Sequence, residues 1–144
     1  MQVIKDESQY SMIDWWKKVL LDKYANFEGR ARRAEFWNFV LFNFLLQLTV
    51  LILSIIFIFL GGFLLWGLLG LYNLAIFIPN LAVIVRRLHD TGKSGWLYFI
   101  AFIPLGGILL IVFLALEGDR GANKYGPDPK QLGRSQIEQI GKEF

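Results

Sequence analysis

Residues 85–96, with the sequence VRRLHDTGKSGW, bring together the side chains of this chain that are best suited to chemistry. They include the only histidine, His89, next to Asp90 and close to Ser94. An imidazole, a carboxylate and a hydroxyl can support acid–base or nucleophilic catalysis, but neighbouring positions in a turn do not specify the geometry of a catalytic triad. The GKS triplet does not complete a nucleotide-binding loop, because Arg87 stands where such a loop requires its earlier glycine.

The counts of metal-binding residue types narrow the chemistry further. The chain has no cysteine, which excludes disulfides and thiolate metal sites, and its single histidine excludes a histidine-rich site within one chain. We therefore expect no cofactor, no metal and no catalytic residue, and we expect no nucleic-acid partner. An enzyme that acts on a lipid headgroup, with His89 as its acid–base group, is kept as an alternative hypothesis.

Two long stretches of the chain carry no Asp, Glu, Lys or Arg, namely residues 36–85 and 96–116. A helix rises about 1.5 Å per residue and a bilayer core is about 30 Å thick, so the first stretch is long enough for two crossings and the second for one. This pattern predicts an all-α integral membrane protein. The expected transmembrane helices cover residues 36–60, 63–85 and 96–116.

The third of these apolar segments contains the residues PLGG at 104–107. Proline removes a helical hydrogen bond, so we expect a kink at Pro104. The alternative is a re-entrant hairpin that turns at the same four residues, each arm of which would be too short to cross a bilayer alone.

We expect a single membrane domain over residues 11–129, with a polar segment on either side of it. Residues 1–10 form a polar N-terminal end, and residues 130–144 form a polar C-terminal tail. An amphipathic helix is expected over residues 12–28. Residues 117–129 are rich in glycine, asparagine and proline, which predicts a turn-rich segment without regular structure.

The apolar residues of segment 12–28 recur at helical spacing, as Trp16, Val19 and Leu20 illustrate. Tryptophans suit the headgroup level of a bilayer, so this helix is expected to lie in the membrane surface. The alternative is an ordinary helix that packs on the rest of the protein.

The positions of the basic residues predict the orientation of the chain. Lysine and arginine gather in the N-terminal region and in residues 85–96, whereas the connection near residues 61–62 has no charge. The positive-inside rule therefore places the N-terminal region and residues 85–96 in the cytoplasm. With three crossings of a bacterial inner membrane, the C-terminus would lie on the periplasmic or extracellular side.

A basic cytoplasmic site is the first functional hypothesis. The first helix begins, the second ends and the third begins at the same interface, so their basic residues should lie together and bind phosphate headgroups or a protein partner. The alternative is a topological anchor and nothing more. The candidate residues of the site are Arg30, Arg32, Arg33, Glu35, Arg86, Arg87, His89, Asp90, Lys93, Ser94 and Trp96.

Two pairs of amide side chains within residues 36–85, Asn43 with Gln47 and Asn73 with Asn80, have spacings that place each pair on one helix face. Their depths from the charged end predict that Asn43 lies near Asn80 and that Gln47 lies near Asn73. We interpret these amides as contacts between helices. A polar path for a solute is the alternative.

Three motifs occur in order along the chain: FEGRARRAEFW, RRLHDTGKSGW and GANKYGPDP. Over residues 24–129 they resemble the domain-of-unknown-function 805 family, small bacterial inner-membrane proteins of the YhaH-like type. The resemblance implies a bacterial membrane protein but no activity. In the tail, the family pattern falls on Asn123, Tyr125, Gly126, Pro127, Asp128 and Pro129, and elsewhere it falls on Gly29, Leu88, Gly95 and most of the candidate site residues above.

These observations favour a non-enzymatic membrane module whose basic cytoplasmic face binds anionic lipid or a protein partner. Membrane lipids are the expected partners, together with a second copy of the chain or another membrane protein. A subunit of an oligomeric small-solute transporter or channel is the main alternative.

Overall fold

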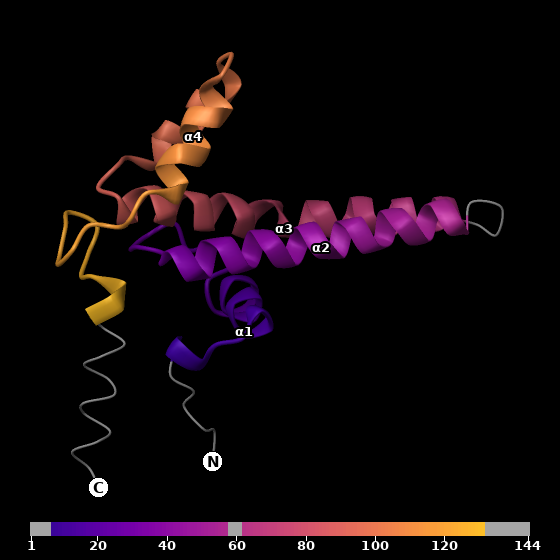
Figure 1. The fold of residues 1–144 in the computed structure, drawn as a ribbon, viewed down its shortest axis with the longest axis horizontal. Coiled ribbons are helices and arrows are strands. Elements are labelled where there is room, and N and C mark those ends of the chain that lie inside the picture. The colour runs from indigo at the N-terminus through magenta and orange to yellow at the C-terminus, as the bar shows by residue number, and fades with distance from the viewer. Residues whose placement is uncertain (1–6, 58–61, 132–144) are drawn as a thin grey trace, which may run out of the picture.

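The computed structural model describes residues 7–57 and 62–131 and is helical throughout these ranges, apart from turns and one isolated bridge (Figure 1). The expected N-terminal end up to residue 6, the turn near residues 61–62 in part, and the polar tail beyond residue 131 lie outside the described residues.

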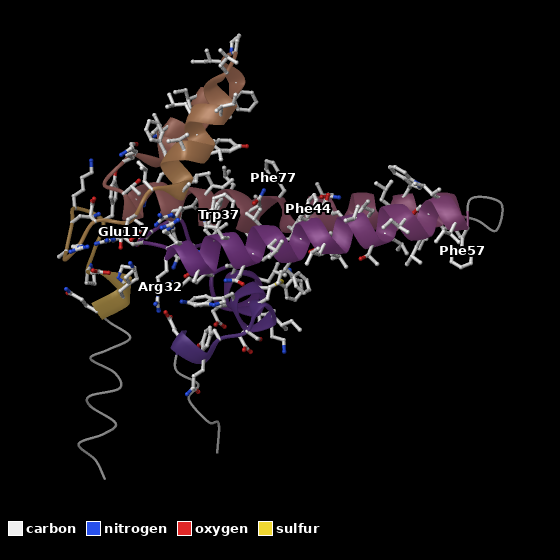
Figure 2. The ribbon with its side chains drawn as sticks, viewed as in Figure 1. Arg32, Trp37, Phe44, Phe57, Phe77 and Glu117 are labelled. Carbon is white, nitrogen blue, oxygen red and sulfur yellow. The ribbon has the colours of Figure 1, made fainter. Side chains whose placement is uncertain are left out.

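Two long antiparallel helices form the body of the molecule, α2 (Arg33–Ile56) and α3 (Gly62–Asp90). They lie side by side along the longest axis in Figure 1. Each is long and apolar enough to cross a membrane by length and composition. Side chains on the parts of both helices far from the charged residues are mostly exposed, as Figure 2 shows for Phe57.

Helix α3 continues through a proline because another side chain replaces the missing hydrogen bond. Pro79 has no N–H, so the carbonyl of Ala75, four residues earlier, has no partner within the helix. The hydroxyl of Tyr24 donates to this carbonyl at 2.6 Å. The N-terminal segment thus stabilises the helix at its weakest point.

The N-terminal segment forms α1 (Met12–Lys17), which runs on as one π-helical stretch, η2 (Lys18–Asp22). A short 3-10 turn, η1 (Glu7–Gln9), precedes α1. Ser11 and Asp14 form a capping box at the start of α1. The helical part is therefore shorter than the expected 12–28.

Helix α1 packs against α2. Trp15 and Val19 are buried, and the Trp16 ring lies 4.9 Å from that of Phe42. This is the packing alternative that the sequence left open. Placement in the membrane surface stays a prediction.

The last apolar stretch does not form one long helix, and the expectation of a full third crossing is wrong. It folds as a hairpin of a 3-10 helix, η4 (Gly95–Phe102), and an α-helix, α4 (Gly106–Ala115). At about 2.0 and 1.5 Å per residue, neither arm reaches beyond roughly 16 Å, about half of a bilayer core. The hairpin projects steeply from the long helix pair (Figure 1).

The hairpin turns at PLGG because these residues suit a tight reversal. Leu105 adopts a left-handed backbone conformation with φ of 64°. Gly106 lies so close to the other arm that a Cβ atom there would collide with the carbonyl oxygen of Ile100. Only glycine allows the two arms to meet in this way.

The hairpin returns the chain to the end from which it started. The N–H of Asp119 donates to the carbonyl of Asp90 at 2.8 Å, and the amide of Asn123 donates to the carbonyl of His89 at 3.0 Å. The expectation that residues 117–129 lie across the membrane from residues 85–96 is therefore wrong, since it depended on a full third crossing. Which side of the membrane this end faces stays a prediction.

The buried apolar core lies where α1, α2, α3 and the hairpin meet. This is near the end of the helix pair at which α2 begins with Arg33 and α3 ends with Asp90, which we call the charged end. Its members are Val19, Ala31, Phe36, Phe39, Val83, Leu88, Leu110 and Leu114. Figure 2 shows Arg32 and Glu117 at this end and Phe57 at the opposite end.

We expect single cysteines at Lys23 and Arg120 to react with a membrane-impermeant maleimide from the same side of the membrane, because both residues lie at the charged end. The native chain has no cysteine, so the labelling is unambiguous. Labelling of the two positions from opposite sides would contradict the hairpin.

Candidate functional site

The charged end contains a cluster of ion pairs that is almost wholly buried, and we call it the charged core. It consists of Lys18, Arg30, Glu35, Arg86, Arg87 and Asp90. The residues come from η2, the segment before α2, and the facing ends of α2 and α3.

Glu35 and Arg86 form the first half of the charged core. Glu35 lies in the first turn of α2, where the positive end of the helix dipole favours a carboxylate. It is 1% exposed and pairs with Arg86, which is fully buried, while the Nζ atom of Lys18 lies 3.2 Å from its other oxygen. The Nε and Nη2 atoms of Arg86 have no hydrogen-bond partner within the described residues.

Asp90 forms the second half by binding two arginines at once. Its Oδ1 atom accepts from Nε of Arg30 at 2.9 Å, and its Oδ2 atom accepts from Nη1 of Arg87. Gly118 passes so close to this carboxylate that a Cβ atom at that position would collide with it. A buried carboxylate between two guanidinium groups joins segments that lie 60 residues apart in the sequence.

Arg87 also donates hydrogen bonds to the carbonyl groups at the C-terminal end of helix α4. Its Nε atom donates to the carbonyl of Leu114 at 3.0 Å, and its Nη2 atom donates to the carbonyl of Leu116. The last carbonyls of a helix lack partners within the helix, and a buried guanidinium is a strong donor for them. Arg87 thereby holds the returning arm of the hairpin at the charged end.

Arg30 fixes the turn-rich segment in the same way. Its Nη1 atom donates to the carbonyl of Gly121 at 2.6 Å, and its Nη2 atom donates to that of Asp119. Asp128 holds the other side of this turn by accepting from the N–H groups of Gly121 and Lys130 at 3.2 and 2.9 Å. Burial alone would raise the pKa of Asp128, but these two N–H groups hold it below its ordinary value.

The structure brings Arg30, Arg86 and Arg87 together with Glu35 and Asp90, but it buries them. Three arginines of the candidate basic site are thus bound to carboxylates and carbonyls, and they are not exposed to phosphate headgroups. Of the remaining basic residues of the candidate site, Arg33 is exposed and Arg32 and Lys93 are half-buried. Arg32 pairs with Glu7 at 2.8 Å, and the Nζ atom of Lys93 lies 5.1 Å from the ring centre of Phe113.

His89 is held between two segments rather than in a catalytic dyad. Its ring stacks on Tyr125 with centroids 3.8 Å apart and planes 5° apart. Its Nδ1 atom lies 3.2 Å from the carbonyl of Gly29. A carbonyl only accepts, so Nδ1 carries the hydrogen and Nε2 is the acceptor of the neutral ring. Lys124 lies with its Nζ atom 4.9 Å from the Tyr125 ring.

The stacked pair lines a cavity of about 560 Å³ between α3 and η4, which we call the groove. Its volume falls in the range of small-molecule sites. Ser94 caps the first turn of η4, and Trp96 is 78% exposed at the edge of the groove. The groove is lined by Phe27, Leu81, Val85, His89, Ser94, Gly95, Trp96, Tyr98, Phe99 and Tyr125.

The tail motif builds the turn that carries Tyr125 to His89. Asn123 and Gly126 form an isolated antiparallel bridge, and the Asn123 side chain accepts from the N–H of Tyr125 at 2.9 Å. Gly126 has a positive φ of 135°, which favours glycine. Pro127 is exposed, and Pro129 is half-buried beside a second cavity of about 400 Å³.

Within the described residues, the intramembrane amides do not form the expected pairs. Asn43 is buried, donates to the carbonyl of Phe39 and accepts from the hydroxyl of Tyr72 instead of pairing with Asn80. Asn73 is exposed and donates to the carbonyl of Leu69. Asn80 is exposed, and Gln47 is half-buried.

Several of the contacts above involve residues that the sequence did not single out. Glu7, Tyr24 and Tyr72 act over long sequence separations, and their types carry no local signal of those partners. Among residues 7–57 and 62–131, no group of three His, Cys, Asp or Glu side chains is placed to hold a metal ion.

Replacement of Asp90 by asparagine should destabilise the protein by about 3–5 kcal/mol, because Arg30 and Arg87 would lose their shared counter-charge in a buried site. Thermal unfolding in detergent, followed by circular dichroism, measures the loss. Arg33→Gln is the matched control, since this exposed residue should change stability by less than about 0.5 kcal/mol. Equal stability of the two variants would show that the charged core does not hold the fold.

Acid should release the N-terminal segment. Burial opposes ionisation of Glu7, but its hydrogen bonds and charge interactions with Lys18 and Arg32 hold its pKa below 4.5. A lowered pKa in the folded state contributes stability above the ordinary value, and this contribution disappears as the pH falls through the lowered pKa. Relative to the intrinsic exchange rate at each pH, the protection of the amides of residues 7–22 against hydrogen exchange should therefore fall between about pH 5 and pH 3.

In Glu7→Gln, the same amides should exchange faster already at neutral pH and should lose this acid-dependent step. A variant that keeps the step would assign it to another carboxylate.

Comparison with known proteins agrees with the motifs described above. A family model described as a protein of unknown function (DUF805) matches residues 24–127. The chain is 42% identical over 116 residues to the inner membrane protein YhaI of Escherichia coli K12, covering 80% of this chain and 95% of that protein. It is 40% identical over 126 residues to the inner membrane protein YhaH of the same strain, covering 82% and 98%. No solved structure matches. The chain therefore belongs to the DUF805 family.

Proposed function

We propose that the chain is a non-enzymatic module of the bacterial inner membrane that binds an anionic phospholipid in the groove. The relatives YhaI and YhaH are inner membrane proteins by name, and α2 and α3 are long and apolar enough to cross a bilayer. The binding site in this proposal differs from the basic face expected from the sequence, because Arg30, Arg86 and Arg87 are buried.

The single observation that carries the proposal is the mainly apolar lining of the groove, which includes the stacked pair beside Lys124. Leu81 and Phe99 line its walls and belong to the two stretches that contain no charged residue. The stacked His89–Tyr125 pair also lines the groove. The exposed Lys124 does not line it, but its Nζ atom lies 4.9 Å from the centre of the Tyr125 ring. An apolar groove with a cation beside its lining fits an acyl chain and a phosphate.

The exposed aromatic residues support placement of the groove at the membrane boundary. Trp96 is 78% exposed, and Trp37, at the charged end of α2, is 38% exposed (Figure 2). Tryptophan is enriched at the headgroup level of bilayers. Exposed basic residues near that level attract anionic lipid by roughly 1 kcal/mol each.

The hydrogen-bonding partners of the carboxylates favour a binding role over the lipid-headgroup enzyme. Asp90 is occupied by Arg30 and Arg87, and Glu35 is occupied by Arg86 and Lys18. His89 therefore has neither of these carboxylates as a catalytic partner. Its contacts with Gly29 and Tyr125 are those of a residue that joins two segments.

The test is native mass spectrometry of the protein transferred from nanodiscs that contain phosphatidylglycerol and phosphatidylcholine. The wild-type protein should retain phosphatidylglycerol in preference to phosphatidylcholine. Leu81→Trp should abolish retention, because the larger ring fills the groove. Leu74→Trp is the matched control, since Leu74 lies on the same helix, is 74% exposed and does not line the groove.

The headgroup contact has its own pair of variants. Lys124→Gln should reduce the preference for phosphatidylglycerol roughly fivefold, as expected from about 1 kcal/mol per basic residue. Arg120→Gln removes another exposed cation of the same segment and should leave the preference unchanged. Equal retention by Leu81→Trp and Leu74→Trp, or a co-purified peptide in place of lipid, would contradict the proposal.

A further inference from the structure

One face of α3 is exposed although it carries amide groups deep within the uncharged stretch. Asn73 and Asn80 lie about 18 and 8 Å from the end of that stretch at Val85, at 1.5 Å per residue. Both are exposed on the surface of the helix pair. Polar side chains at such depths ordinarily face other helices, because lipid tails offer no hydrogen-bond partner.

The two amides retain unused hydrogen-bonding groups. The side-chain nitrogen of Asn73 donates to the carbonyl of Leu69 at 2.8 Å, which leaves its oxygen free within the described residues. Asn80 forms no side-chain hydrogen bond within residues 7–57 and 62–131. The unbonded amide oxygen of Asn73 and the unbonded amide group of Asn80 indicate that a hydrogen-bonding partner is missing at both depths.

These amides are part of a regular pattern on α3, which we call the seam. Its residues follow one another at intervals of 4, 3, 4 and 3, and they are Trp66, Gly70, Asn73, Phe77 and Asn80, all of them exposed. This is the spacing of a left-handed helix–helix contact. Trp66 and Phe77 are 56% and 57% exposed, and Phe77 projects outward from the helix pair in Figure 2.

Gly70 makes room for a close approach at the seam. A Cβ atom at this position would have open space around it, so no packing within the chain requires the glycine. Small residues at this kind of position let helix backbones approach in membranes.

We propose that the seam is the interface of a parallel homodimer, in which Asn73 meets Asn73 and Asn80 meets Asn80 of a second copy. Two copies inserted in the same orientation place identical residues at identical depths, and a two-fold axis along the membrane normal brings each to its equivalent. An amide pair is self-complementary, because each side chain has both donors and an acceptor. A second copy of the chain therefore presents an amide at each of the two depths, simply because its sequence and orientation are the same.

The first test uses single cysteines, which the native chain lacks. In oxidised membranes, cysteines at 73, 77 and 80 should form disulfide-linked dimers efficiently. A cysteine at Leu74 should react much less, because Leu74 is rotated by about 100° from the preceding residue although it is 74% exposed. Equal cross-linking at 74 and 73, or none at any seam position, would overturn the proposal.

The second test measures association of the intact protein in bilayers by single-molecule photobleaching over a range of dilutions. Asn73→Leu and Asn80→Leu should each weaken the dimer about threefold, and the double variant should weaken it roughly eightfold. Thr49→Leu is the control, since Thr49 is an exposed polar residue of α2 whose hydroxyl is bonded to the carbonyl of Leu45. An unchanged dimer in the double variant would exclude the amide contacts.

Discussion

A buried charge must have a counter-charge and hydrogen-bond partners, and this requirement governs the arrangement of the whole charged end. Asp90 is the counter-charge of both Arg30 and Arg87, and Arg87 in turn donates hydrogen bonds to the last carbonyl groups of α4. Removal of one partner from such a cluster leaves an uncompensated charge at a cost of about 3–5 kcal/mol. The segment before α2, the end of α3 and the end of the hairpin are thus fixed to one another by the same few atoms.

The apolar parts of the molecule follow from this arrangement. Because the end of α4 is held beside Asp90, the 21 residues of the last apolar stretch must go out and return, and Gly106 and Leu105 supply the turn. The outgoing arm, η4, then lies beside α3 and forms the groove. The seam lies on a different part of α3, so lipid binding in the groove and association through the seam do not compete for the same residues.

The sequence predicted the broad fold because charge distribution is a strong signal. The absence of charge over residues 36–85 predicted two long apolar helices, and the distribution of arginines predicted that residues 30–35 and 85–90 would meet. It predicted a third crossing and kept the hairpin only as the alternative, because PLGG is compatible with both. The choice depends on contacts of Arg87 with carbonyl groups near residue 115, and backbone carbonyls carry no sequence signal.

The same limit applies to the candidate site. The residue types of the basic site were predicted, but their burial was not, because the number of carboxylates near them does not show which arginines are paired. The bond from Tyr24 to the carbonyl of Ala75 likewise follows from Pro79 only when the neighbouring chain is known. A single local cue, an isolated proline within an apolar helix, indicates that some donor is needed there.

The central claim is that the charged core holds the end of the hairpin at the charged end, and a distance across that end tests it most directly. Spin labels are placed at Lys93 and Arg120, the residues that follow Gly92 and Asp119 in the sequence. Gly92 and Asp119 lie close together, because a Cβ atom at position 92 would lie 2.7 Å from the carboxylate of Asp119. Electron–electron double resonance in bilayers should give one distribution well below 30 Å, the approximate thickness of a bilayer core. A distribution at or above that thickness would show that the last apolar stretch crosses the membrane, and it would contradict the account.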